Sequence, residues 1–302
     1  MKRLLRCAAV ILVVAGGAGC RATRGQSSGS RDSAELTQRE ARLAGALAHP
    51  DTASDSPLAR WLLPPGLAEI SGLALTPDQR LLAHGDEAGR VFEVDYRRGV
   101  VVKSFWVGPQ VVRGDFEAIA VAGARIFLLA SSGKIYEFTE GAEGTRVPFT
   151  LHDTRLGQEC EFEGLAFDSV ANALVLACKH LGIKSLRDFV VLYKYSLAGG
   201  SESRISRVTI PLTQVIGANR WKGFTPSDIS VDPGSGDYVI IASEEQGLLR
   251  VTPAGEVVWS RPIPPGHEMP EGLAITKDSL LILSDETTSK AKPGTITLYR
   301  WP

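Results

Sequence analysis

The sequence predicts an all-β domain folded as a single β-propeller of five four-stranded blades. Three observations predict it. A five-residue phrase recurs five times, each copy is followed by short β-branched apolar runs separated by turn residues, and the copies are 46, 46, 64 and 44 residues apart. A period in the forties is the length of one four-stranded blade. The copies begin at Ser71, Glu117, Glu163, Ser227 and Glu271.

The strands of the first two blades follow from the apolar runs and the turns between them, such as Pro77-Asp78 and Gly123-Ala124. In the first blade we expect strands at residues 71–76, 80–84, 90–96 and 100–107. In the second we expect them at 117–122, 125–130, 134–139 and 147–152.

The interval of 64 residues does not require an extra blade. Residues 163–212 already supply four strands, and 213–225 have the composition of an irregular insertion. If residues 213–225 instead belong to a further blade, the propeller has six blades. The last unit supplies only three strands, at 271–276, 280–284 and 295–301. We therefore expect residues 59–63 to pair as its outer strand and close the ring, which would remove an open sheet edge.

The amino end has the features of an export signal. Lys2, Arg3 and Arg6 precede a short apolar run at residues 7–14 and then small residues up to Cys20. The run is far shorter than the roughly 20 residues of a membrane-spanning helix. The small residues before Cys20 are similar to a bacterial lipoprotein cleavage box, which would make Cys20 an acylated N-terminus at the end of a signal peptide spanning residues 1–20. Gly17 stands where such boxes usually have Leu, so cleavage without lipidation remains the alternative.

A tether is expected between this signal and the propeller. Residues 21–57 are rich in polar and small residues and show no strand alternation, which is typical of a flexible linker. Within it, residues 33–47 favour a short, marginal helix. The propeller domain is expected to occupy residues 58–302.

The net charge limits which partners the protein can bind, and the cysteines bear on whether it contains a disulfide. Removal of Lys2, Arg3 and Arg6 takes the formal net charge from −1 to −4, and no basic stripe with interleaved aromatic residues is present, which argues against nucleic-acid binding. Two cysteines, Cys160 and Cys178, remain in the mature body. In an oxidising compartment they could form a disulfide, and two unpaired thiols are the alternative.

Four phrases resemble the SdiA-regulated family of bacterial envelope propellers: residues 115–120 (DFEAIA), 161–167 (EFEGLAF), 173–179 (ALVLACK) and 270–275 (PEGLAI). The Glu-Gly-Leu-Ala phrase also occurs in esterase-like phytase propellers. The resemblance covers nearly the whole body and implies an exported propeller with a bound calcium ion.

The repeats place acidic residues around one end of the propeller channel. The first residue of each inner strand should lie at the channel mouth, which gives Ser71, Glu117, Glu163, Ser227 and Glu271. The turns that emerge on the same face add Asp86, Glu87, Lys179, Glu244, Glu245, Asp285 and Glu286. Asp228 is one residue out of register and is expected to face away from the channel.

Carboxylates crowded in this way raise one another's pKa unless positive charge compensates them. We therefore expect a hard divalent ion at the mouth, calcium before magnesium, with Glu117, Glu163, Glu271, Ser71 and Ser227 as ligands. In the alternative interpretation the glutamates accept hydrogen bonds from backbone N–H groups and water fills the mouth. No His/Cys cluster with ligand spacing is present, which disfavours a soft metal.

Two functions follow from these expectations. The first is a binding or scaffolding module, anchored to the membrane by lipid, that takes an unknown small-molecule or protein ligand and acts as a monomer. The aromatic residues Trp221 and Phe224 of the insertion could contact that ligand. The second is a metal-dependent hydrolase of phosphoesters or lactones, although the sequence identifies no catalytic residue and contains no serine-hydrolase elbow. Arg21 after Cys20 favours the outer membrane facing the periplasm, with the plasma membrane as the alternative.

Overall fold

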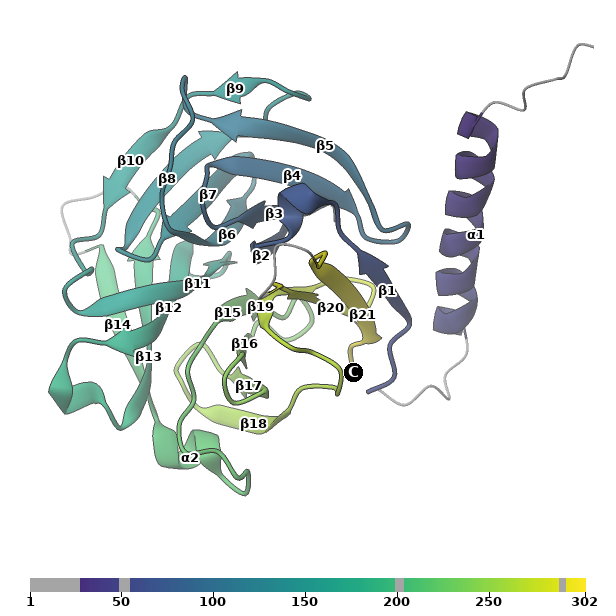
Figure 1. The fold of residues 1–302 in the computed structure, drawn as a ribbon. Helices are drawn as coiled ribbons and strands as arrows, with labels where there is room; N and C mark the ends of the chain where they lie inside the picture. The colour runs from purple at the N-terminus through teal and green to yellow at the C-terminus, as the bar shows by residue number, and fades with distance from the viewer. Residues whose placement is uncertain (1–27, 49–54, 199–203, 288–291) are drawn as a thin grey trace, which may run out of the picture.

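The computed structural model describes residues 28–48, 55–198, 204–287 and 292–302, and within them the chain forms a five-bladed β-propeller (Figure 1). Blade 1 contains β2 (Ile70–Leu75), β3 (Leu81–Gly85), β4 (Arg90–Asp95) and β5 (Val100–Val107). Blade 2 contains β6 (Phe116–Ala122), β7 (Arg125–Ala130), β8 (Lys134–Thr139) and β10 (Thr150–Asp153). Blade 3 contains β11 (Cys160–Asp168), β12 (Ala173–Leu181), β13 (Phe189–Ser196) and β14 (Ile205–Pro211).

Blades 4 and 5 complete the ring. Blade 4 contains β15 (Asp228–Val231), β16 (Tyr238–Ala242), β17 (Gly247–Val251) and β18 (Val257–Pro262). Blade 5 contains β19 (Pro270–Ile275), β20 (Leu280–Asp285), β21 (Thr295–Arg300) and β1 (Ala59–Leu62). The inner strands β2, β6, β11, β15 and β19 gather around the centre of the ring (Figure 1). The prediction of five blades is confirmed, and the alternative of six is wrong.

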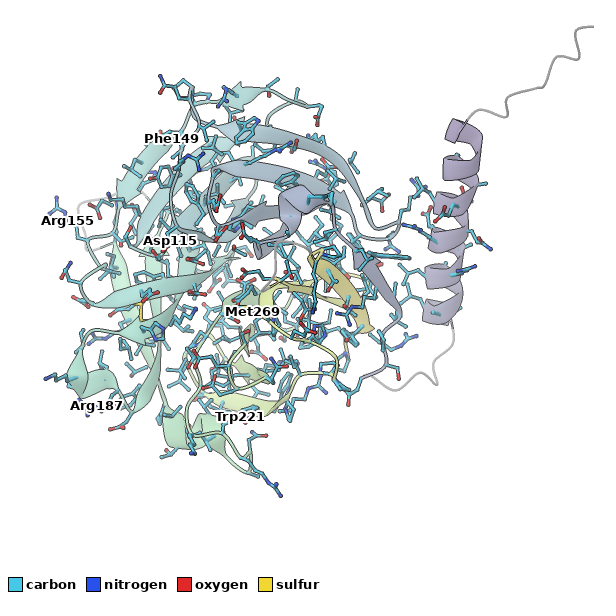
Figure 2. All side chains as sticks on the ribbon, viewed as in Figure 1. Asp115, Phe149, Arg155, Arg187, Trp221 and Met269 are labelled. Carbon is cyan, nitrogen blue, oxygen red and sulfur yellow. A yellow bond between two sulfur atoms is a disulfide. The ribbon has the colours of Figure 1, made fainter. Side chains whose placement is uncertain are left out.

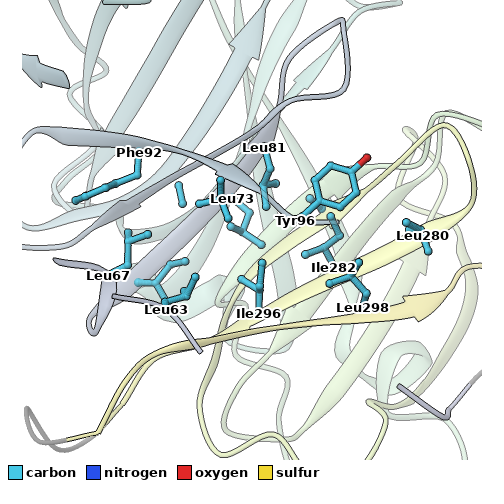
Figure 3. Close-up of a cluster of buried hydrophobic side chains, with 14 of the residues drawn as sticks. Leu63, Leu67, Leu73, Leu81, Phe92, Tyr96, Leu280, Ile282, Ile296 and Leu298 are labelled. Atoms are coloured by element: carbon cyan, nitrogen blue, oxygen red, sulfur yellow. The ribbon is translucent and has the colours of Figure 1, made fainter. Parts of the chain in front are cut away.

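Ring closure follows the predicted pairing of the two ends of the domain. Strand β1 pairs antiparallel with β21, so that Ala59 lies opposite Leu298 and Leu62 opposite Thr295. Apolar side chains from blades 1 and 5 pack together beneath this seam (Figure 3). They include Leu63, Leu67, Leu73, Leu81, Phe92, Ile282, Ile296 and Leu298. The seam is therefore held by both a strand ladder and a shared apolar core.

The predicted strand at residues 147–152 is instead two strands. Residues Arg146–Val147 form β9, which pairs in parallel with β5 of blade 1, and only β10 joins blade 2. Pro148 stands between the two strands. Since proline has no backbone N–H to donate to a ladder, it interrupts the run at this point.

The insertion after blade 3 begins with the short helix α2 (Leu212–Ile216) and continues as a loop to the start of blade 4. Two 3₁₀ turns occur elsewhere, η1 (Pro65–Leu67) before blade 1 and η2 (Lys184–Leu186) between β12 and β13.

Helix α1 (Ser28–Ala48) lies beside the ring, next to β1 and the turn between β4 and β5 (Figure 1). Leu43 is 1 % exposed and belongs to the core of the seam. Arg98 donates to Glu40 Oε2 at 2.7 Å, and Arg300 Nη2 donates to the carbonyl oxygens of Ala46 and Leu47. The helix expected at residues 33–47 is thus longer and packs against the propeller, where a flexible tether was expected. Residues 1–27 and 49–54, which hold the signal, Cys20 and the rest of the tether, lie outside the described residues.

Side chains that accept backbone hydrogen bonds close the turns after four of the inner strands. Thr76 Oγ1 accepts from Arg80 N, and Thr276 Oγ1 accepts from Leu280 N. Asp168 and Asp232 do the same through Oδ1 in blades 3 and 4. Threonine and aspartate in this position satisfy N–H groups that the strand ladder leaves free, which fixes where each inner strand ends.

Candidate functional site

In four of the five blades, the residue that opens the repeated phrase lies on a β-bulge. In blade 3, Phe162 is opposite Cys178 and Gly164 is opposite Ala177, which leaves Glu163 without a partner in the register. The same irregularity isolates one residue in each of blades 1, 2 and 5. The four unpaired residues are Ser71, Glu117, Glu163 and Glu271. Since a bulge redirects the extra side chain, it accounts for acidic groups on strands that are otherwise buried.

The glycine after the glutamate permits close approach of neighbouring strands. A Cβ on Gly164 would lie 3.0 Å from the backbone nitrogen of Ile229 in blade 4, and one on Gly272 would lie 2.2 Å from Ser284 Oγ and 2.9 Å from Leu73 in blade 1. A side chain at either position would therefore push blades apart. In the Glu-Gly pair, the bulge redirects the carboxylate of the glutamate, and the glycine allows its strand to lie close to the neighbouring blade.

Glu117, Glu163 and Glu271 share one electrostatic environment. Burial, together with the charge of Glu163, raises the pKa of Glu117 to about 9. Burial raises the pKa of Glu271 to about 8, again with a contribution from Glu163. Burial also raises the pKa of Glu163 itself. The charge of Glu163 in blade 3 therefore acts on the glutamates of blades 2 and 5.

Lys179 is the cation at the centre of this group. Its ammonium donates to Glu163 Oε1 at 2.6 Å. Burial acts to lower the pKa of Lys179, but the hydrogen bond to Glu163 and the charges of Glu271 and Glu117 together raise it. Lys179 is also unpaired in the register between β11 and β12. One ammonium is thus shared among at least three carboxyl groups.

Two further acids from neighbouring turns extend the group toward blades 5 and 1. Burial, together with the charges of Asp86 and Glu69, raises the pKa of Glu286 to about 7. Burial likewise raises the pKa of Asp86. We call Glu117, Glu163, Lys179, Glu271, Glu286 and Asp86 together the acidic mouth.

The hydroxyls predicted as metal ligands are engaged with the backbone. Ser227 Oγ donates to Pro270 O at 2.9 Å, and Ser71 Oγ donates to Glu69 O at 3.4 Å. Each bond leaves the hydroxyl oxygen with acceptor capacity.

The other predicted mouth residues fall into two groups. Glu87 and Glu244 are exposed on their turns. Glu245 accepts from Thr225 N at 2.9 Å and thereby holds the end of the insertion loop. In that loop, Phe224 is buried and Trp221 packs over Gly247, so both aromatic side chains contribute to packing.

Asp285 was predicted to lie at the channel mouth, but its carboxylate lies inside blade 5, where it is hydrogen-bonded. Its Oδ2 lies 2.8 Å from His267 Nδ1 and accepts from Thr295 Oγ1 at 3.1 Å. His267 Nε2 lies 2.8 Å from Tyr299 Oη. Strand β20 extends through Asp285, which pairs with Pro270 and Thr295, and this directs the carboxylate into the blade.

Asp228 does not face away as expected but bridges two inner strands. It is 1 % exposed, and its Oδ2 accepts from Leu273 N of blade 5 at 2.7 Å. Burial raises its pKa well above the ordinary value, and Glu271 adds to the effect. The signal was present in the sequence, since Asp228 occupies the repeat position that is glycine or alanine in the other four copies.

A disulfide joins Cys160 to Cys178 and ties β11 to β12 beside the acidic mouth (Figure 2). Cys178 directly precedes Lys179, and Cys160 lies three residues before Glu163. The bond therefore connects the two strand segments that carry the ion pair.

Two findings bear on metal and membrane chemistry. Within the described ranges, no group of three or more His, Cys, Asp or Glu side chains is arranged to hold a metal ion. In the same parts of the chain, no helix has the length and apolar character that crossing a membrane requires.

Comparisons with known proteins agree on the fold. No family model matches the chain, and no curated protein matches it. Solved structures do. Myxococcus xanthus glutaminyl cyclase has a TM-score of 0.51 at 14 % identity, over 80 % of this chain and 94 % of that one. The PQQ-bound aldose sugar dehydrogenase of Streptomyces coelicolor has a TM-score of 0.51 at 12 % identity, over 80 % and 98 %. At these identities the likeness shows the fold alone, and this chain is a β-propeller whose structural neighbours include propeller enzymes.

Proposed function

We propose that the acidic mouth binds a divalent cation of the calcium type and that the protein is an envelope-anchored binding module. The observation that carries the proposal is the imbalance of charge. Glu117, Glu271 and Glu286 have pKa values raised to about 9, 8 and 7 around the single ammonium of Lys179. An added cation would stabilise the ionised form of these carboxyl groups, so it would bind with release of their protons and more tightly as the pH rises.

The oxygen donors of the acidic mouth are of the kind that calcium binds, but they are not spaced as a coordination site. Carboxylate and hydroxyl oxygens are the ligands that calcium prefers, and calcium tolerates irregular geometry more readily than magnesium. The acids are not arranged as a preformed coordination site in the described residues. Glu117 and Glu271 would hold the ion, with Ser71 and Ser227 as further oxygen donors, and their side chains would have to converge. Glu163 remains paired with Lys179.

The envelope location rests on the amino end of the sequence. The charged residues, apolar run and small residues before Cys20 support export and lipid attachment. The resemblance to the SdiA-regulated family supports the same location. A Cys20→Ser variant tests it: the wild-type protein should fractionate with membranes and require detergent for release, whereas the variant should be released without detergent.

Calorimetric titration of chelator-treated protein with calcium and with magnesium tests the cation site. We expect calcium to bind and to raise the melting temperature, because a ligand that binds only the folded state stabilises it. The double variant Glu117→Gln/Glu271→Gln should lose both effects, while Glu256→Gln, an exposed glutamate of blade 4, should retain them. If calcium gives neither heat nor a shift in melting, the proposal fails.

A second candidate function is metal-dependent hydrolysis of a phosphoester or a lactone. It is favoured by Glu286, whose pKa of about 7 suits a group that gives and takes protons near neutral pH. The propeller enzymes among the structural neighbours add only an analogy of fold. Turnover of p-nitrophenyl phosphate or a γ-lactone that needs calcium and is lost in Glu286→Gln, with melting unchanged, would establish the enzyme. Calcium binding without turnover would favour the binding module.

A further inference from the structure

The end of the channel opposite the acidic mouth contains a cavity of about 310 Å³. All five inner strands contribute to its wall through their last residues, and the turns that follow them form its rim. Glu117, Glu163 and Glu271 of the acidic mouth stand near the start of three of these strands. The two sites therefore lie at the two ends of one ring of strands.

Apolar side chains make up the larger share of the cavity wall, and Thr76, Gln79, Ser169 and Ser230 add polar groups. The fifth residue of every repeat lines it, and in four of the five blades this side chain is only partly buried. These residues are Leu75, Val121, Phe167, Val231 and Ile275. Water against these five apolar side chains has few polar partners, so an apolar ligand that displaces it there gains free energy.

The charge at the rim is positive. Of the residues that line the cavity, Lys277 is the charged one. Its ammonium lies 3.4 Å from Pro77 O and makes no ion pair with any described residue. Nearby carboxylates are committed elsewhere: Asp278 pairs with Arg97, and Asp232 pairs with Arg250.

We propose that this cavity binds a small apolar carboxylate, such as a medium-chain fatty acid. The five apolar side chains would contact the hydrocarbon chain, and Lys277 would pair with the carboxylate at the rim. This chemistry differs from that of the acidic mouth, which repels anions. The inference is therefore independent of the cation site, and neither result decides the other.

Calorimetric titration with butanoate, hexanoate and octanoate, in buffer containing a calcium chelator, tests the proposal. We expect affinity to rise about fourfold with each added methylene until the cavity is filled. In Lys277→Met, affinity for octanoate should fall about tenfold because a charge-assisted contact is lost. Affinity for 1-octanol, which has no charge, should stay the same in that variant.

Two further variants complete the design. Lys222→Met, which removes an exposed lysine of the insertion loop, is the matched control and should bind octanoate like the wild type. Ser230→Trp places a large side chain in the cavity wall and should abolish binding of both ligands. If Ser230→Trp does not fold, the Lys277→Met comparison decides alone. The proposal is overturned if the wild type binds no octanoate at millimolar concentration, or if Lys277→Met leaves octanoate affinity unchanged or weakens octanol equally.

Discussion

Lys179 and Glu163 meet at 2.6 Å, and each is the residue that its strand leaves unpaired in the register between β11 and β12. Two irregularities thus face one another across a single pair of strands. Because neither residue is held by a Cα partner at that point, their side chains can turn out of the blade and toward the other glutamates.

Removal of Lys179 should destabilise the protein through the charge it leaves behind. In Lys179→Met, Glu163 loses its partner while its side chain remains 8 % exposed. We expect the free energy of unfolding at pH 8 to fall by about 2 kcal/mol. The double variant Lys179→Met/Glu163→Gln should recover most of that loss, as measured by urea denaturation. Additive losses in the double variant would argue against a direct interaction.

The stability of the metal-free protein should fall as the pH rises. Burial and the charge of Glu163 raise the pKa of Glu117 to about 9 and of Glu271 to about 8, from an ordinary value of 4.5. Above pH 4.5 the folded protein therefore keeps protons that the unfolded chain has lost. The stabilisation that results is complete below about pH 4.5 and is lost as the pH passes through 8 to 9.

Melting temperatures between pH 5 and pH 9, in the presence of a chelator, measure this dependence. Glu271→Gln should make it shallower, since glutamine does not titrate, and the exposed Glu256→Gln should leave it unchanged. Equal slopes for all three proteins would mean that Glu271 is ionised in the folded state across this range.

Loss of the disulfide should weaken the blade that carries the ion pair. Cys160 and Cys178 are 18 residues apart, and a loop of that length contributes about 3 kcal/mol when it is closed by a disulfide. The variant Cys160→Ala/Cys178→Ala should lose about that much in denaturant unfolding. Addition of a reductant should lower the stability of the wild type and have no effect on the variant. A reductant effect of equal size on both proteins would point to a different cause.

Helix α1 should contribute to ring stability through one buried side chain. Leu43 is 1 % exposed in the core of the seam, so we expect Leu43→Ala to cost about 3 kcal/mol. Its exposed neighbour Arg42 supplies the control, because Arg42→Ala should change the unfolding free energy by less than about 0.5 kcal/mol. A Leu43→Ala variant as stable as the control would indicate that the helix is not docked in solution.

Most of the fold could be predicted from the repeat, because the length of each blade and the position of each inner strand follow directly from it. The repeat also predicted Glu117, Glu163 and Glu271 at the same end of the channel. The bulges could not be predicted, since they depend on the register between strands and leave no mark in a single sequence. The change of Asp285 from mouth to interior has the same origin, because one residue of register reverses the direction of a side chain. Asp228 is different, since it stands where the other four copies have glycine or alanine, and this set it apart in the sequence. The docking of α1 depends on Arg98 and Arg300, which are far from it in the sequence.

Strand β1 comes before the first blade but completes the last one, and this has a mechanical consequence. A pull on the amino end of the domain would load the β1 and β21 pairing along its length, so that several backbone hydrogen bonds would resist together. Helix α1 precedes β1 and contributes Leu43 to the same seam, so it adds a second layer of contacts over the strand whose removal would open the ring. The contacts of α1 would then have to break before the four pairs of Ala59–Leu62 with β21 are loaded, and the ring opens when those pairs separate.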